Sequence, residues 1–239
     1  MAALKPVEWI GSSKEDFVDF PDLVQDEMGY ALYLAQTGGM HAQAKPLKGF
    51  GGAGVVELVK DHRGSAYRAV YTVRFAAAVY VLHAFQKKSR KGIKTERSDI
   101  MLIKRRLRIA EEKHQELHEM RKITDHGVTH GTGNIFADLG FSDPETHLLK
   151  ARLVSRMQEA IEAEGLSQAQ AAKRMGVAQP DVSRLLRGRF RNYSVERLMR
   201  LLTALGCEVE IIVRPKKMAR SRSSKAESRG DVSLRTHPR

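Results

Sequence analysis

Three short stretches in the first half of the chain are rich in β-branched and aromatic residues. They cover Val55–Val59, Tyr67–Arg74 and Ala77–Phe85. In the second and third, apolar and other side chains alternate, which places successive residues on opposite faces of a strand. The turn at His62–Gly64 and a tight bend near Ala76 separate the stretches. The pattern therefore predicts an antiparallel meander.

Two segments whose apolar residues recur at helical intervals flank this meander. The segment Pro21–Gln36 repeats apolar residues at helical intervals, begins at a proline and is followed by two glycines. A longer helix is expected over Asp99–Met120, with Ile103, Leu107 and Ala110 on one stripe. With a short strand at Val7–Ile10, these elements predict an α+β domain over residues 1–119.

The second half changes to helical patterning. Asp143–Pro144 is typical of a helix start, and apolar residues then recur at helical spacing until Gly165. A further helix is expected from Ser194 to Leu205, followed by a short strand at Cys207–Val213. We expect a linker at 120–133, an all-α helix-turn-helix domain with a short C-terminal strand at 134–215, and a disordered basic tail at 216–239.

The segment Leu166–Gly188 has the pattern of a DNA-binding helix-turn-helix. Ser167 and Gln170 are spaced as a capping box, which marks the start of the first helix. Ala172 is small enough for a close helix crossing, and Gly176 stands where the turn requires positive φ. An ordinary helical hairpin with a solvated basic face is the alternative.

In a helix-turn-helix the second helix enters the major groove of DNA. Gln179 is suited to adenine, and Arg184 to guanine or phosphate. Asp181 can accept from cytosine or lie at the positive end of the helix dipole. The full set of expected DNA-binding residues is Ser167, Gln168, Gln179, Asp181, Ser183, Arg184, Arg187 and Arg189, with Arg191 as a further phosphate contact.

Residues 134–215 resemble the Cro/repressor class of regulators and, within it, the HigA-type antitoxins. The matching stretches are NIFADLGFSDPE, LSQAQAAKRMGVAQPDVSRLLRGR and ERLMRLLTALGCEVEIIV. The resemblance implies a lambda-repressor-like fold and a homodimeric repressor that binds the operator of its own genes.

Charge adds a second candidate nucleic-acid surface. The chain carries a formal net charge of +13, and residues 45–108 hold 16 basic and 4 acidic residues. The basic run Phe85–Lys94 directly follows an expected strand, where it can bind an RNA backbone or form a solvated loop. His83 is the titratable base beside this run, and the alternative for it is a partly buried histidine with satisfied hydrogen bonds.

The first half resembles the phage-derived HigB-type toxins, which belong to the RelE-like mRNA interferases. The matching stretches are LKGFGGAGVVELV, YRAVYTV and VYVLHAFQKKSRK. The resemblance implies a small basic α+β protein that cuts mRNA at the ribosome. It places Arg68, His83, Lys87 and Lys88 around the scissile phosphate, and Lys48, Arg90 and Lys91 along the RNA backbone.

The two resemblances together suggest a toxin and its antitoxin in one chain, with Met120 as a candidate internal start. The alternative is a transcriptional regulator whose toxin-like half is catalytically inactive and mediates interactions. Cys207 is the single cysteine, which fits a reducing cytoplasm, and the longest apolar run, Phe75–Leu82, is too short for a membrane span. We expect no cofactor and no metal: the glycine-rich Gly49–Gly54 is read as a turn, and two histidine pairs spaced four apart have no neighbouring cysteine.

Overall fold

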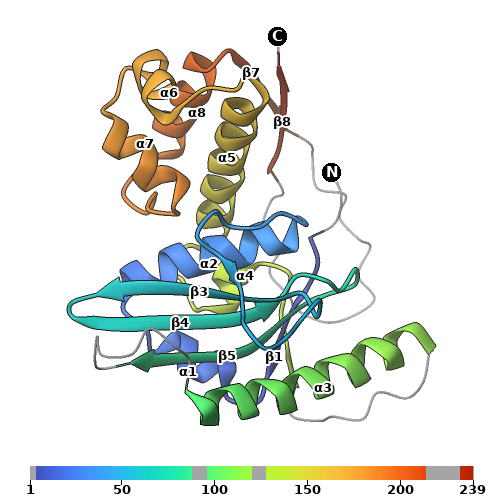
Figure 1. Ribbon diagram of the computed structural model, residues 1–239. Coiled ribbons are helices and arrows are strands. Elements are labelled where there is room, and N and C mark those ends of the chain that lie inside the picture. The colour runs from blue at the N-terminus through green and yellow to red at the C-terminus, as the bar shows by residue number, and fades with distance from the viewer. Residues whose placement is uncertain (1–3, 88–95, 120–127, 214–231, 239) are drawn as a thin grey trace. The chain divides into compact units, whose positions relative to one another are not determined.

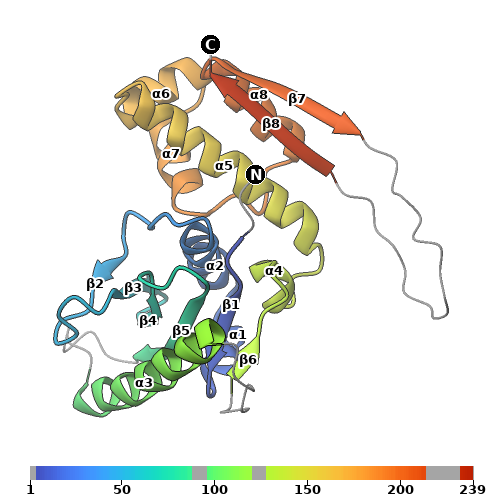
Figure 2. The same ribbon diagram turned by 90° about the vertical axis from the view of Figure 1, so that its right-hand side faces the viewer.

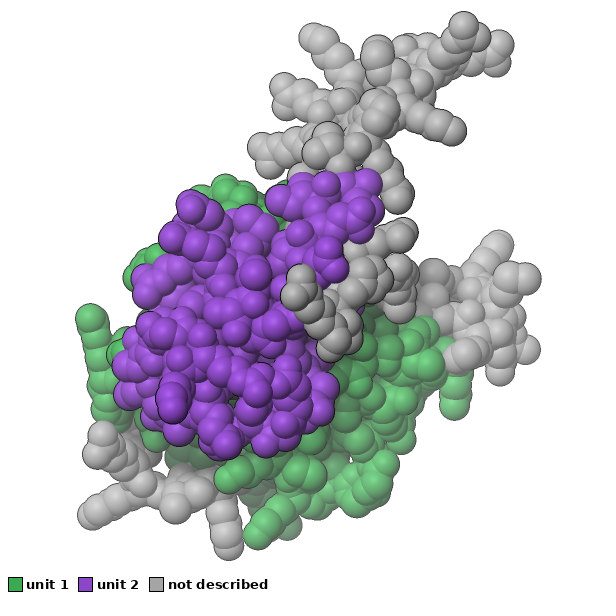
Figure 3. All heavy atoms as spheres, turned by 90° about the horizontal axis from the view of Figure 1, so that it is seen from above, with its two compact units in different colours: residues 1–152, 184–192 green, residues 153–183, 193–239 purple. Residues whose placement is uncertain are grey.

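The computed structural model describes residues 4–87, 96–119, 128–213 and 232–238. They divide into two compact units, which Figure 3 colours separately. Unit 1 comprises residues 1–152 and 184–192, and unit 2 comprises residues 153–183 and 193–239. The sites expected at Lys88, Arg90, Lys91 and Met120 lie outside the described residues.

Unit 1 is built on a six-stranded sheet of order β2-β3-β4-β5-β1-β6. The central strands β3, β4 and β5 pair antiparallel, which confirms the predicted meander. Strand β1 pairs parallel with β5, an arrangement that the sequence pattern did not indicate. The strands are β1 Val7–Ile10, β2 Lys45–Pro46, β3 Val55–His62, β4 Ser65–Thr72, β5 Val79–Lys87 and β6 Val128–His130.

The hairpin between β3 and β4 explains why β3 runs beyond its expected end and why β4 begins before its expected start. His62 and Ser65 form the last pair of the ladder, and Arg63 and Gly64 both have positive φ, at 46° and 82°. A two-residue turn with both residues in this region matches the right-handed twist of the flanking strands. Pairing therefore continues up to the turn itself.

Helices cover the two faces of this sheet. Helix α2 (Asp22–Gln36) and helix α3 (Arg97–Glu119) lie on opposite sides of β3–β5 in Figure 1. The stripe Ile103, Leu107 and Ala110 of α3 packs into a core with Val70 and Leu82, as the helical spacing predicted. In the short helix α1 (Ser13–Val18), Phe17 packs edge-on against Trp9 of β1, with ring centroids 5.6 Å apart.

The segment expected as a linker contributes to the sheet of unit 1. Val128–His130 pairs antiparallel with β1 as β6, so this part of the linker prediction is wrong. The short helix α4 (Ile135–Asp138) follows, and Asn134 caps it by accepting from the Phe136 amide. A Cβ placed on Gly29 of α2 would lie 3.2 Å from Leu139 and 3.3 Å from Phe136. Glycine at position 29 therefore lets this segment pack closely on α2.

Unit 2 contains the helix-turn-helix. Helix α5 (Pro144–Ala163) begins in unit 1 and ends in unit 2, and α6 (Gln168–Met175), α7 (Gln179–Leu186) and α8 (Val195–Ala204) follow. Figure 2 shows strand β7 (Cys207–Val213) beside strand β8 (Val232–Pro238), with which it pairs antiparallel. The prediction of disorder is therefore wrong for residues 232–238, where Val232, Leu234 and Thr236 alternate in a manner suited to a strand.

Among the described residues, no helix combines the length and the apolar character that a membrane crossing requires.

Candidate functional site

The helix-turn-helix has the local geometry that its sequence predicts. The Ser167 hydroxyl accepts from the Gln170 amide at 3.3 Å, and the Gln170 side chain accepts from the Ser167 amide at 2.8 Å. This reciprocal capping box fixes the start of α6. Gly176 ends α6 in the left-handed conformation, with φ of 65°. The chain can therefore turn sharply into α7 at a residue without a Cβ.

Two exposed glutamines lie together at the starts of the two helices. The Gln179 side-chain amide donates to the Gln168 side-chain oxygen at 3.0 Å. This contact fixes the orientation of Gln179 at the first residue of α7, the end that meets base edges in this class of motif. The Ser167 hydroxyl is already hydrogen-bonded to Gln170 in the capping box. A contact between this hydroxyl and DNA would have to be made in addition to those bonds or in place of them.

The other expected DNA-binding residues follow along α7. Asp181 lies in the first turn of α7, where a carboxylate interacts favourably with the positive end of the helix dipole. Ser183 is half-buried. Arg184 and Arg187 are exposed. The arginines at 189 and 191 are placed differently, because the structure brings them against α2 of unit 1.

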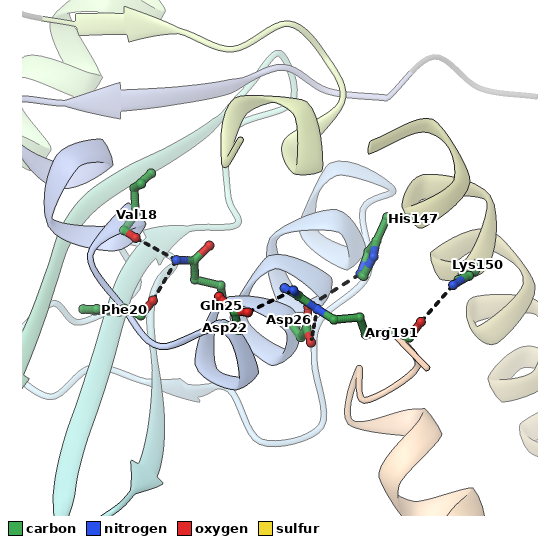
Figure 4. Close-up of polar contacts among 8 residues, drawn as sticks. All are labelled: Val18, Phe20, Asp22, Gln25, Asp26, His147, Lys150 and Arg191. Carbon is green, nitrogen blue, oxygen red and sulfur yellow. Dashed lines mark hydrogen bonds and ion pairs between the residues drawn. The ribbon is translucent and has the colours of Figure 1, made fainter. Parts of the chain in front are cut away.

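Arg189 and Arg191 form ion pairs with three carboxylates of α2. Arg189 pairs with Glu27. The Nε of Arg191 donates to both carboxylate oxygens of Asp26 at 3.0 Å, and its Nη1 donates to Asp22 at 3.1 Å (Figure 4). Sequence reasoning assigned these arginines to phosphate and missed their carboxylate partners on α2.

Between these arginines, Phe190 is a fully buried apolar anchor. Its ring centroid lies 5.3 Å from that of Tyr30 and 5.1 Å from that of His147. Just before it, Gly188 has φ of 95°, and a Cβ there would lie 2.8 Å from the Cβ of Tyr30. Only glycine fits this close approach without a shift of the backbone. Residues 188–191, which we call the docking segment, are therefore shaped to lie on α2.

Burial perturbs the charged groups around the docking segment. Burial raises the pKa of Asp26, while the hydrogen bonds and charge of Arg191 act to lower it. Burial, and then the charge of Arg191, lowers the pKa of His147 to about 4. Asp22, His147, Lys150 and Arg191, which Figure 4 labels, are among the residues that line an open hollow of about 300 Å³ beside the segment.

The sheet brings three of the expected catalytic residues to one face. In the register of β4 and β5, Arg68 lies opposite Phe85, and Val70 lies opposite His83. Residues at every second position share a face, so Arg68, His83 and Lys87 all lie on the face that α3 covers. Each of the three is also engaged within the chain: Arg68 pairs with Glu57 at 2.7 Å, and Lys87 pairs with Glu96 at 3.3 Å.

His83 belongs to a polar cluster that the sequence did not reveal. Its Nδ1 lies 3.3 Å from Nη1 of Arg106, and its Nε2 lies 3.5 Å from Asp99. Arg106 also donates to the Leu82 carbonyl at 2.9 Å and to the Ser12 hydroxyl at 2.8 Å. Burial, and then the charge of Arg106, lowers the pKa of His83 below its ordinary value. Arg106 adjoins the apolar stripe of α3, a position that could have marked it as buried.

The expected RNA-binding residue Lys48 is exposed in the segment between β2 and β3. The glycine-rich Gly49–Gly54 occupies the same connection and contains turns, as the sequence predicted. Among the residues that the structure describes, no three histidine, cysteine, aspartate or glutamate side chains are grouped to hold a metal ion.

Two stretches of the chain match known protein families. Residues 15–108 match the family of phage-derived Gp49-like proteins, and residues 135–214 match a helix-turn-helix domain family. Among solved structures, the chain is similar to one described as an XRE family transcriptional regulator, with 40% sequence identity and a TM-score of 0.32. That alignment covers 37% of this chain and 99% of the other. Among curated proteins, no relative of the chain was found.

Residues 15–108 are therefore similar to a Gp49-like, toxin-family domain, and residues 135–214 are similar to the DNA-binding helix-turn-helix domain of a regulator.

Proposed function

We propose that the chain is a toxin–antitoxin module in a single polypeptide. The helix-turn-helix domain represses its own promoter as a HigA-type antitoxin, and the Gp49-like domain is a HigB-type endoribonuclease that cuts mRNA at the ribosome. The antitoxin half restrains the toxin half, within one chain or between the two chains of a homodimer. The site of action is the cytoplasm.

The observation that carries the DNA-binding half of this proposal is the contact between Gln179 and Gln168. Both side chains are exposed, and their hydrogen bond of 3.0 Å holds the Gln179 amide in a defined orientation. An oriented glutamine amide can make two hydrogen bonds with adenine in the major groove. Arg184 of α7 and Arg187 just after it are exposed and would add guanine or phosphate contacts.

The ribonuclease half is supported by the shared face of Arg68, His83 and Lys87. Cleavage of RNA without a metal needs a group that accepts the 2′-hydroxyl proton and cations that stabilise the phosphorane. Lys87 is half-buried at the end of β5, where it can reach a phosphate by leaving Glu96, itself exposed. Lys88 and Lys48 would add charge along the RNA.

A second candidate function is favoured by the burial of Arg68 and His83. Arg68 is 4% exposed and His83 is 8% exposed, and both are engaged by neighbouring side chains. In this alternative the Gp49-like domain is catalytically inactive and serves as an interaction module of a transcriptional regulator.

Expression of residues 1–152 in cells distinguishes the two functions. This fragment retains β6 and α4, which pack in unit 1 and which a fragment ending at residue 119 would lack. Growth arrest with new mRNA 5′ ends supports the toxin, and their loss in Lys87→Ala but not in Lys104→Ala would assign the site. Normal growth and intact mRNA, with the fragment folded by circular dichroism, would establish the inactive alternative.

Autorepression has a separate test. The full chain is expected to footprint a two-fold site in the promoter of its own gene and to lower expression of a reporter placed behind that promoter. A Gln179→Ala variant should lose the footprint. An unchanged reporter would exclude autorepression, and western blotting for a short product would show whether Met120 starts a separate antitoxin.

A further inference from the structure

Arg189 and Arg191 are phosphate-binding candidates by sequence and carboxylate partners in the structure. We propose that these two arginines serve both anions in turn, so that docking of residues 188–191 on α2 and contact with the DNA backbone exclude each other. In this way α2 of the Gp49-like domain regulates DNA binding. The inference rests on the proposed binding of DNA by the helix-turn-helix.

The hydrogen-bond donors of Arg191 are directed to α2. Its Nε reaches both oxygens of Asp26 at 3.0 Å, its Nη2 lies 2.9 Å from Asp26, and its Nη1 lies 3.1 Å from Asp22. A phosphate that took over these donors would stand within a few ångströms of two carboxylates. Like charges so close repel each other, so binding of a phosphate is strongly disfavoured while the guanidinium is held by the two carboxylates.

Arg189 is paired with a more deeply buried carboxylate, that of Glu27. The side chain of Glu27 is 2% exposed, and it is paired with Arg189 and, at 2.8 Å, with Lys60 of β3. When Arg189 leaves, Lys60 remains as a partner for Glu27, so the carboxylate does not lose all compensation. A buried carboxylate with a second cation can therefore exchange the first one, whereas an unpaired buried charge would forbid release.

The apolar contacts make the docked state the resting state. Release of the segment would bring Phe190, which is fully buried against Tyr30 and His147, into water. DNA must supply enough phosphate contacts to offset this exposure. The exposed residues Gln168, Gln179, Arg184 and Arg187 lie outside the docking segment, so the device lowers the affinity of DNA binding rather than abolishing it.

Removal of single negative charges from α2 tests the exchange in the full chain. We choose Glu27→Gln, which keeps the side-chain shape, and Asp22→Asn, whose side chain is 81% exposed and whose loss does not endanger folding. Asp19→Asn is the matched control, because it removes the same charge from an exposed position just before α2. The probe is a random-sequence DNA duplex of about three helical turns, titrated by fluorescence anisotropy over a series of KCl concentrations.

The expected result is tighter DNA binding, by about tenfold for Glu27→Gln and about threefold for Asp22→Asn over Asp19→Asn, as for an allosteric coupling of ordinary size. The slope of log affinity against log salt should also steepen by about one for each arginine released. An Arg189→Gln background should remove the gain from Glu27→Gln, because the released cation is then absent.

The following results would overturn the inference. Equal gains in all three acidic variants would show a general charge effect, and unchanged salt slopes would show that no new phosphate contact forms. A gain from Glu27→Gln that persists with Arg189→Gln would assign it to another group. If the wild type and every variant fail to bind DNA, the proposed function fails and this inference with it; binding by the wild type with no change in the variants overturns the inference alone.

Discussion

The guanidinium of Arg106 lies 3.3 Å from Nδ1 of His83, and it also donates to the backbone carbonyl of the preceding residue, Leu82. Arginine has donors and no acceptor, so Nδ1 of His83 must accept, and the ring proton must then sit on Nε2. Nε2 faces Asp99 at 3.5 Å, which is suited to that proton. The arrangement favours neutral His83 with one defined tautomer.

We therefore expect the pKa of His83 to rise when Arg106 is replaced. Burial is the larger cause of the lowered pKa and the charge of Arg106 is the next. Arg106→Met should therefore remove the effect of the charge and leave the effect of burial. Titration of the His83 ring signals by NMR measures the shift. Arg105→Met is the control, because Arg105 is an exposed neighbour on the same helix. An unchanged pKa in Arg106→Met, or an equal rise in both variants, would contradict the assigned contact.

The buried imidazole of His147 predicts a loss of stability in mild acid. Burial lowers its pKa to about 4 from an ordinary 6.5, so between these values the unfolded chain binds a proton that the folded chain does not. The stabilisation is fully present above about pH 6.5 and is lost as the pH falls toward 4, and amounts to at most ~3 kcal/mol.

Urea denaturation at several pH values measures this effect. His147→Leu should flatten the loss of stability between pH 6.5 and 4 relative to wild type, because leucine does not titrate and can occupy the pocket among Phe136, Phe141 and Phe190. His62→Gln, at the end of β3, is the control that removes an imidazole outside this pocket. A His147→Leu curve parallel to that of wild type would assign the dependence to other groups.

The ion pair between Arg68 and Glu57 makes Arg68 important for folding as well as a candidate for catalysis. Arg68 is 4% exposed, and removal of Glu57 would leave its charge without this partner. We expect Glu57→Gln to lower the free energy of unfolding by about 3 kcal/mol, as for other broken buried pairs. Chemical denaturation measures this, with Glu112→Gln on the exposed face of α3 as the control. A loss below about 0.5 kcal/mol, within the range of ordinary surface substitutions, would show that other groups compensate Arg68.

The sequence predicted elements whose signals are local. The capping box of Ser167 and Gln170, the turn at Gly176 and the stripe of α3 each depend on residues a few positions apart, and each was found where expected. Strand β6 was missed because three residues in a segment rich in glycine and histidine carry no alternation, and their pairing with β1 spans more than a hundred residues. Local patterns cannot report such a contact.

The residues of the candidate sites differ in the same respect: some have a local sequence signal, and others are brought together only by contacts between distant parts of the chain. Sequence patterns suggested Gln179, at the start of the second helix of the motif, as a residue suited to adenine, but they did not suggest its bond to Gln168. They did not suggest that Arg191 meets Asp26, because the two lie 165 residues apart and the arginine follows a motif that implies phosphate. Arg106 was missed because a charged residue on a long helix is typical of a solvated surface. Its position beside the apolar stripe of α3 could have marked it as buried, but its contact with His83 has no local signal.

The pair Gln168 and Gln179 predicts a defect in sequence recognition that leaves general DNA affinity intact. Gln179→Ala removes the amide that would read a base edge, which should cost about 1–3 kcal/mol on the operator and little on random-sequence DNA, where phosphates dominate binding.

Gln168→Ala should give a smaller loss on the operator, because it only releases Gln179 from the orientation that the 3.0 Å bond imposes. The two losses should be less than additive in the double variant, since Gln168 acts through a side chain that is then absent. Gln158→Ala on α5 is the control, as its side chain bonds to Glu162 within its own helix. Additive losses, or an equal loss on random DNA, would show that the two glutamines contact DNA independently and that their bond does not position Gln179 for base recognition.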